Sequence, residues 1–140
     1  MSQATLSIPL DWASIARGTP YKPGAFAFLQ GGLRYTAEIF ETVEFDNYGL
    51  HELDRHVTGQ QLCMGLRDYA IEQYGLLSQV VLRQWGIRRT EDFGAIVFRM
   101  VDLELLHTSP EDSEDDFRAI YQFDEAFHER ELEDCIGSNR

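Results

Sequence analysis

The sequence predicts a mainly helical α+β fold in a single globular domain that spans residues 1–140. Apolar residues recur at helical spacing along most of the chain, capping signals and glycines separate these segments, and only short stretches alternate as a strand does. A chain of 140 residues suits one domain. Folding at that length buries roughly two-thirds of the unfolded chain's surface without a disulfide or metal. Residues 1–7 are expected to form an N-terminal extension and residues 135–140 a frayed tail.

The first helix is predicted over residues 8–17. Asp11 can accept hydrogen bonds as its N-cap, and Gly18 can end it. A turn with two prolines follows, and Pro23 suits the first position of the next helix because proline has no N–H to leave unpaired there.

A second helix is predicted from Pro23 through Leu33. Gly31 and Gly32 weaken it by about 1 kcal/mol each relative to alanine. Glycines on an apolar helix face indicate that another segment packs closely against them. Residues 39–45 partly alternate between apolar and polar, which predicts a strand, although an extension of the helix fits the same residues.

The clearest local signal begins the helix predicted over residues 58–74. Thr58 and Gln61 have the spacing of a capping box. In a capping box, the side chain of each residue accepts a hydrogen bond from the backbone N–H of the other. Val57 stands where a hydrophobic staple is expected, and Gly75 fits the end of the helix.

Two more helices are predicted over residues 77–85 and 91–102. Gly86 separates them at a turn that needs an unusual backbone angle. Thr90 is the expected N-cap of the second helix, and the two acidic residues after it suit the positive end of the helix dipole.

Short strands are predicted near residues 103–107 and 117–123. The acidic segment between them, residues 109–116, is expected either to begin a helix or to form an exposed loop. Asp124 is predicted to cap a last helix that contains Phe127.

This order of three helices and two strands resembles a winged helix-turn-helix. Residues 91–102 would be its recognition helix, and residues 109–116 would form its wing. Both carry acidic side chains, whereas a helix that reads DNA offers Arg, Lys, Asn or Gln. The order of the elements therefore predicts a winged-helix-like core, while the acidic side chains argue against DNA binding.

The net charge of −12 makes nucleic acid an unlikely partner, since a field of this sign repels phosphate backbones. Most of the excess lies in residues 109–140, which hold 11 acidic and 3 basic side chains. The charge is also consistent with simple solubility.

Several motifs together resemble those of an uncharacterised protein family that is largely restricted to planctomycetes and verrucomicrobia. They are Tyr21 with AFAF and LRYT, then RHVTGQQL, WGI, TEDFGAIVF and the late DF…YQFDEAF, and they run from Tyr21 to Phe127. The resemblance implies a bacterial source and one coherent domain. It implies no activity, cofactor or catalytic residue.

No motif predicts a reaction or a cofactor. His51, His56 and Cys63 could be imagined around zinc, but the histidines are five residues apart rather than the four that place two ligands on one helix face. Cys63 falls within a helical pattern, which favours a buried structural thiol over a nucleophile. The acidic segment 109–116 lacks the spacing of a calcium loop. Gly31 and Gly32 lack the lysine of a phosphate-binding loop.

The sequence predicts a cytoplasmic protein. The first residues lack the basic and apolar segments of a signal peptide, and no apolar run is long enough for a membrane span. The two cysteines, Cys63 and Cys135, are far apart and suggest no disulfide framework.

The favoured hypothesis is a non-enzymatic acidic adaptor or regulatory domain that binds another protein. Aromatic residues are numerous for the length, which indicates either a bulky core or rings that are partly exposed. Exposed aromatics rimmed by arginines and acids are typical of interfaces. The predicted partner-binding residues are Arg83, Arg88, Arg89, Glu91, Asp92 and Arg99. The alternatives are a winged-helix nucleic-acid regulator or nucleic-acid mimic and, third, an enzyme or metal protein of unknown reaction.

Overall fold

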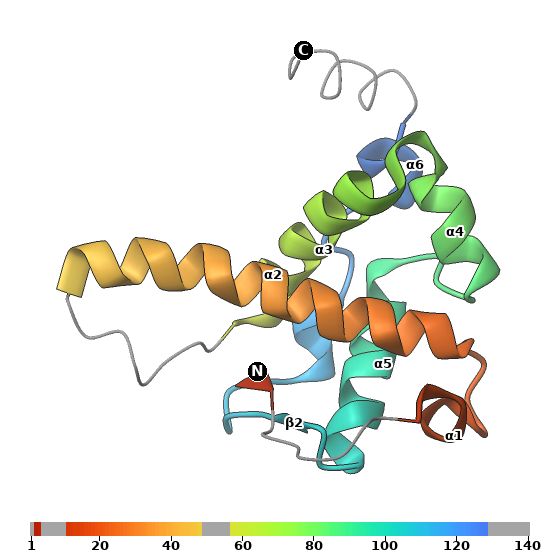
Figure 1. Ribbon diagram of the computed structural model, residues 1–140, viewed down its shortest axis with the longest axis horizontal. Coiled ribbons are helices and arrows are strands. Elements are labelled where there is room, and N and C mark those ends of the chain that lie inside the picture. The colour runs from red at the N-terminus through yellow and green to blue at the C-terminus, as the bar shows by residue number, and fades with distance from the viewer. Residues whose placement is uncertain (1, 4–10, 49–56, 129–140) are drawn as a thin grey trace.

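The computed structural model describes residues 2–3, 11–48 and 57–128, with the side chains of 11–39 and 57–128, and shows a mainly helical chain (Figure 1). The helices are α1 (Trp12–Ala16), α2 (Pro23–Tyr48), α3 (Gly59–Tyr74), α4 (Ser78–Gln84), α5 (Thr90–Asp102) and α6 (Phe123–Ala126). The strands β1 (Ser2–Gln3) and β2 (Leu106–His107) pair antiparallel. The turns η1 (Gly75–Leu77) and η2 (Glu114–Phe117) are short 3-10 helices. The prediction of a mainly helical fold is confirmed.

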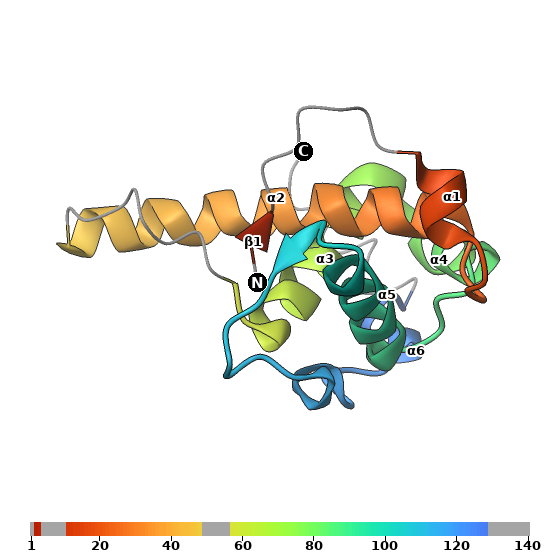
Figure 2. The same cartoon turned by 90° about the horizontal axis from the view of Figure 1, so that it is seen from below.

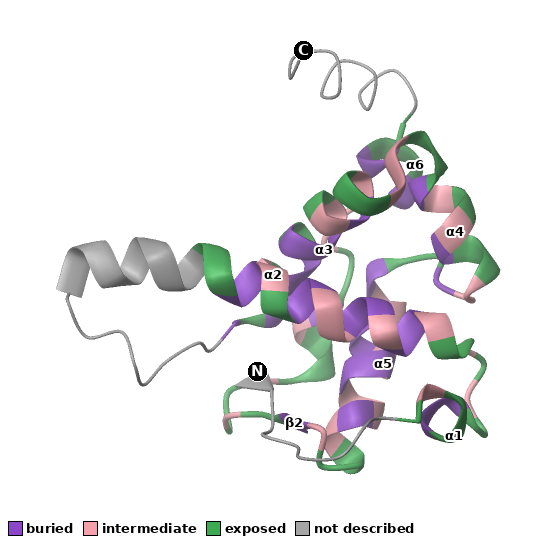
Figure 3. Cartoon of the chain, in the orientation of Figure 1, coloured by how far each residue is buried: buried purple, intermediate pink, exposed green. Residues whose placement is uncertain are grey.

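The long helix α2 organises the molecule, because the other helices gather around one part of it. It packs against α1, α3 and α5, and Figure 2 shows that its last turns extend beyond the other helices. Buried residues concentrate where α2, α3 and α5 meet (Figure 3). This junction is the hydrophobic core.

Glycines let α2 and α3 approach closely. A Cβ added to Gly65 of α3 would overlap the side chain of Thr36, and one added to Gly32 of α2 would overlap Leu66. Thr36 is buried, and its hydroxyl donates a hydrogen bond of 2.7 Å to the Gly32 carbonyl within its own helix. The close packing predicted at Gly31 and Gly32 is therefore confirmed.

Both ends of α3 follow the predicted local signals. Thr58 is the N-cap: its hydroxyl accepts a hydrogen bond from the Gln61 backbone N–H at 3.1 Å. The Gln61 side chain accepts in return from the Thr58 N–H at 3.0 Å, which completes the capping box. Val57 is fully buried, and Gly75 ends the helix with φ +55°.

The helix α5 lies inside the molecule. Within it only Asp102 is exposed. Its fully or nearly fully buried residues are Thr90, Phe93, Gly94, Ile96, Val97 and Met100. A helix that enters a DNA groove needs an exposed face, so this burial argues against α5 as a recognition helix.

Thr90 differs from its predicted role as N-cap. The N-cap is Arg89, and Thr90 is the first residue of the helix, with its side chain buried. The Thr90 hydroxyl donates to the Phe117 carbonyl at 2.6 Å and accepts from the Ile120 N–H at 3.2 Å. The hydroxyl that the sequence pattern assigns to capping the helix therefore forms hydrogen bonds with a distant segment instead.

The strand predicted over residues 39–45 is wrong, since these residues continue α2. Helical propagation from the well-formed first turns of α2 outweighs a weak alternation. Of the helix predicted over residues 8–17, residues 12–16 form α1, capped by Asp11, and residues 8–10 lie outside the described part. None of the helices within 11–48 and 57–128, α2 included, is long and apolar enough to cross a membrane.

The strand predicted over residues 117–123 is also wrong. Phe117 ends η2 and Phe123 begins α6, while Ala119 between them has φ +49°, which no strand residue adopts. The predicted strand at 103–107 shortens to β2, whose partner is β1 from the N-terminal extension. The wing of a winged helix is therefore not formed as predicted, although Gly86 does take the expected turn conformation, with φ +93°.

Candidate functional site

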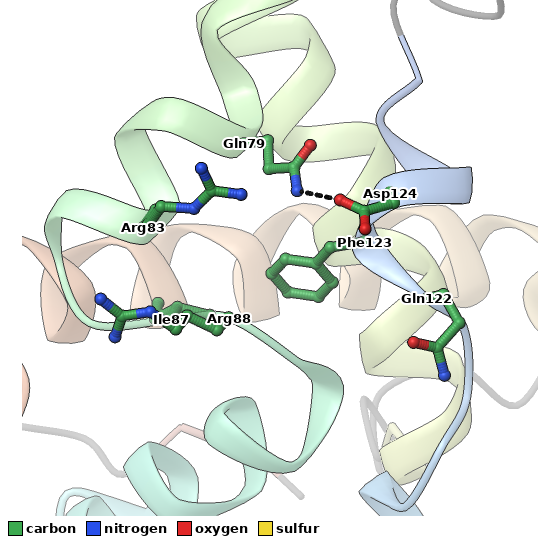
Figure 4. A pocket seen from close by; sticks show the side chains of 7 residues that line it. All are labelled: Gln79, Arg83, Ile87, Arg88, Gln122, Phe123 and Asp124. Carbon is green, nitrogen blue, oxygen red and sulfur yellow. Dashed lines mark hydrogen bonds between the residues drawn. The ribbon is translucent and has the colours of Figure 1, made fainter.

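Two of the six predicted partner-binding residues, Arg83 and Arg88, line the same pocket. It has a volume of about 300 Å³ and lies between α4, the loop that follows α4, and the start of α6 (Figure 4). Its lining is Gln79, Arg83, Ile87, Arg88, Gln122, Phe123 and Asp124. Segments far apart in the sequence therefore meet at this place.

The pocket has a mostly polar surface above two buried apolar side chains. Ile87 and Phe123 are buried, while Arg83, Arg88 and Asp124 are exposed. The Gln79 side-chain amide donates a hydrogen bond of 2.8 Å to one Asp124 carboxylate oxygen, which ties α4 to α6 across the rim. Figure 4 shows the Arg83 guanidinium on the same side as Gln79, pointing toward Asp124.

The two pocket arginines make no ion pair or side-chain hydrogen bond with any residue whose placement is described. Elsewhere on the molecule, Arg67 lies 3.5 Å from Asp68 and Arg118 lies 3.1 Å from Asp115. Among the described residues neither guanidinium is within ion-pair distance of a carboxylate, although Asp124 lies on the same rim.

Asp92 serves the fold. Its carboxylate accepts hydrogen bonds from the Tyr21 hydroxyl at 2.7 Å and from the backbone N–H groups of Arg88 and Arg89 at 2.8 and 3.2 Å. Burial and then the bond to Asp92 raise the pKa of the Tyr21 phenol above its usual value. Asp92 thus fixes the start of α5 and fastens it to the segment before α2.

Arg99 and Glu91 lie away from the pocket. The Arg99 guanidinium donates to the carbonyls of Ile15 and Arg17 at 3.5 and 3.4 Å, so it closes the C-terminal end of α1. Glu91 is half-buried beside Thr90, whose hydroxyl lies 3.4 Å from its carboxylate. Arg89 is exposed next to Arg88 in the loop. The structure therefore brings Arg83 and Arg88 together and distributes the other residues among structural contacts.

A cluster of exposed aliphatic side chains lies beside Arg83, and the sequence analysis missed it. Leu76 and Leu77 of η1 are 48 and 62% exposed, and Val80 of α4 is 49% exposed. We name these three residues the α4 face. Val80 and Arg83 are three residues apart in α4, which makes them neighbours on the helix surface. Helical periodicity assigns Leu77 to a buried stripe, because spacing alone does not tell which side of a short helix faces the core.

Of the two explanations for the numerous aromatic residues, a bulky core fits the structure better than an exposed surface. Every aromatic side chain within 11–39 and 57–128 is buried or half-buried. Phe28, Tyr69, Tyr74 and Trp85 pack together, with ring centroids 5.4 to 6.3 Å apart in the pairs that they form. The rings therefore mainly serve the core, and the exposed apolar surface is aliphatic.

Of the residues considered for catalysis or metal binding, Cys63 lies in the described ranges. Cys63 is buried in α3, and burial, with a smaller effect from Glu91, raises the pKa of its thiol to about 12. A thiol of this kind is a poor nucleophile. Across the described ranges no group of three His, Cys, Asp or Glu side chains is arranged to hold a metal. His51 and His56 lie outside these ranges.

No protein-family model, no curated protein and no solved structure matches the chain. The resemblance to a planctomycete and verrucomicrobial family therefore stays a prediction. Inferences about function rest on the geometry of the molecule itself.

Proposed function

We propose that this chain is a non-enzymatic adaptor or regulatory domain that binds another protein through the α4 face. The observation that carries the proposal is the exposure of Leu76, Leu77 and Val80 within five residues of the chain. The nearby Arg83 and Arg88 make no ion pair within the part of the chain that the structure describes. Exposed aliphatic residues scattered singly are ordinary on a soluble domain, but a contiguous group marks an interaction surface.

The composition of this region suits a protein interface. Interfaces place apolar side chains at the centre and polar groups at the rim, and arginine is enriched among the residues that contribute most to binding. The α4 face supplies the apolar centre, while Arg83 and Arg88 at the pocket supply the rim. The tie between Gln79 and Asp124 holds α4 in place, which limits the entropy lost on binding.

Other functions fit the molecule less well. A nucleic-acid regulator would need an exposed recognition helix, and every residue of α5 before Asp102 is buried or half-buried. An enzyme would need a nucleophile or paired acids in an enclosed site, and the pocket between α4 and α6 offers two arginines, two amides and one carboxylate.

Affinity capture from native lysate tests the proposal when variants of one surface are compared. The tagged parent chain is compared with the tagged variants Leu77→Asp and Val80→Asp as bait. Met64→Asp is the matched control, because Met64 is 52% exposed on the neighbouring α3. We expect a protein that the parent chain and Met64→Asp retain equally, and that both α4-face variants lose by about tenfold or more, since a charge would be buried without a partner.

Circular dichroism and thermal unfolding of each variant show whether it stays folded. The proposal is wrong if the α4-face variants retain the same proteins as the parent chain in the same amounts. It is equally wrong if nothing is retained above background while the chain runs as a monomer in light scattering.

A further inference from the structure

Acidic residues are missing from two segments of a chain that is otherwise rich in them. Residues 12–37 and 73–90 contain no Asp or Glu, although the whole chain has 24. The same two segments hold six of the 12 basic residues, namely Arg17, Lys22, Arg34, Arg83, Arg88 and Arg89. Charge is therefore segregated along the sequence, and the fold decides whether these cations share a surface.

The fold brings the two acid-free segments together at the loop between α4 and α5. The Lys22 backbone N–H donates a hydrogen bond of 3.1 Å to the Trp85 carbonyl. One carboxylate oxygen of Asp92 accepts from the Tyr21 hydroxyl, and the other accepts from the backbone N–H groups of residues 88 and 89. The segment before α2 therefore lies beside the loop that follows α4.

Four exposed cations belong to this junction or flank it, and we name them the basic patch: Lys22, Arg83, Arg88 and Arg89. Within 11–39 and 57–128 none of their side chains makes an ion pair. Figure 4 shows the Arg88 guanidinium directed away from Phe123, so this side chain faces outward and not into the pocket.

The acidic side chains near the basic patch do not cancel its charge. Asp92 is half-buried and accepts three hydrogen bonds, and Asp124 accepts one from a side chain of α4. Burial and the bond to Asp92 raise the pKa of the Tyr21 phenol. Of the remaining charges, Arg89 lowers that pKa by more than Glu114 raises it. Positive charge therefore dominates beside Tyr21.

The partner that suits the basic patch is short and acidic. Exposed charges act over about 8 Å at physiological salt, so a short segment meets mainly the patch. A long duplex or a membrane surface would also face the acidic remainder of a chain of net charge −12. Because single exposed ion pairs contribute little affinity, the patch mainly selects the partner and speeds its association.

Apolar contacts must supply most of the affinity, and the α4 face is continuous with the basic patch. Val80 and Arg83 are three residues apart in α4 and both are exposed, so they are neighbours on the helix surface. A partner that reaches the patch therefore meets exposed aliphatic side chains next to it.

We propose that the basic patch and the α4 face together bind a short acidic segment of another protein, in which carboxylates stand beside apolar side chains. The carboxylates face Lys22, Arg88 and Arg89, and the apolar side chains cover Leu77 and Val80. The inference rests on the proposed function, since it names the kind of partner that the α4 face takes.

Fluorescence anisotropy with labelled probes tests the inference on the full chain. One probe is a short peptide of glutamate and leucine at helical spacing, and its counterpart has glutamine in place of every glutamate. A short DNA duplex and phosphatidylserine vesicles represent phosphate-bearing partners. We expect the glutamate peptide to bind about tenfold tighter than its glutamine counterpart and to bind more weakly as salt rises from about 50 to about 300 mM.

Two double variants place this binding on the surface. Arg88→Gln combined with Arg89→Gln should weaken binding of the glutamate peptide by about fivefold. The fold is kept, because the backbone N–H groups that bind Asp92 remain. Arg34→Gln combined with Arg118→Gln removes the same charge from exposed positions outside the patch and should leave the affinity unchanged.

The inference is overturned if the glutamate peptide does not bind, if its glutamine counterpart binds equally, or if the two double variants behave alike. Binding of the duplex or of the vesicles at least as tight as that of the peptide would also overturn it. A protein captured equally by the parent chain and by the Arg88→Gln, Arg89→Gln variant, but lost by Leu77→Asp, would overturn the acidic partner and leave the proposed function intact.

Discussion

Thr90 shows how one buried hydroxyl can join two distant segments. It is fully buried at the start of α5, where it donates to the Phe117 carbonyl and accepts from the Ile120 N–H. The first is the backbone carbonyl at the end of η2, and the second is a backbone N–H in the irregular segment between η2 and α6. Without this hydroxyl they would lose their hydrogen-bond partner inside the protein.

Replacing Thr90 by valine should therefore destabilise the fold by about 1–3 kcal/mol, since the buried Phe117 carbonyl and the part-buried Ile120 N–H lose their partner while the shape is kept. Thr90→Ser is the matched control: it keeps the hydroxyl and should cost only about 1 kcal/mol for the lost methyl group. Urea unfolding followed by circular dichroism measures both. Equal stabilities for the two variants would show that these hydrogen bonds contribute little.

The buried thiol of Cys63 gives a pH dependence with a definite sign. Burial raises its pKa from 9.0 to about 12 in the folded chain. Below pH 9 the thiol is protonated in both states, so its contribution to stability is complete. As the pH rises above 9, the unfolded chain releases the proton first, and stability falls until the folded thiol also ionises.

The free energy of unfolding should thus decline more steeply above about pH 9 in the parent chain than in Cys63→Ala. The slope is the quantity to compare, because the substitution also removes packing at every pH. Urea titrations at several pH values between about 8 and 11 give it. Parallel curves for the two proteins would contradict a raised thiol pKa.

At the residue scale, local chemistry could be predicted from the sequence and long-range partners could not. Asp11 and Thr58 cap helices as their spacing indicates, since a cap involves only the next three residues. Thr90 and Asp92 are also polar residues at a helix start, but their partners include Phe117 and Tyr21. No spacing rule connects residues that only the tertiary fold brings together.

The contact between α2 and α3 depends on small residues where the two helices meet. Gly65→Ala should destabilise the fold by about 1–3 kcal/mol, because the added methyl group overlaps the buried Thr36 side chain. Helix propensity alone predicts the opposite sign, a gain of about 1 kcal/mol. Thermal or urea unfolding decides between them, and a stabilised variant would contradict the close packing.

A second substitution locates the clash. In a Thr36→Ala background, Gly65→Ala should cost less than in the parent chain, since the hydroxyl and methyl groups of Thr36 that oppose the new Cβ are gone. Equal costs in both backgrounds would place the strain elsewhere.

At the element scale, strong periodicity predicted helices and weak alternation predicted strands that do not exist. The residues of α3, α4 and α5 have regular apolar spacing, and those of α3 also have a capping box. These helices begin and end within two residues of the expected positions. Residues 39–45 and 117–123 alternate only partly. The conformation of residues 39–45 follows from the turns of α2 that precede them. The conformation of residues 117–123 follows from their packing around the start of α5.

At the scale of the whole molecule, the sequence predicted the acidic character and part of the candidate site. Arg83 and Arg88 were identified as a cluster because they are close in the sequence, and both line the pocket. The α4 face and the contribution of Phe123 were missed. Which apolar residues stay uncovered depends on how the helices pack, and this information is absent from the pattern of any single segment.

The most direct test of the central claim is hydrogen–deuterium exchange of the chain with and without the protein that it captures. The account predicts that binding slows exchange in peptides covering residues 75–88, the segment that holds the α4 face and the pocket arginines. Peptides from the buried helix α5 should change little. Protection confined to α2 or to the acidic segment 109–116, with residues 75–88 unaffected, would contradict the claim that the α4 face is the binding surface.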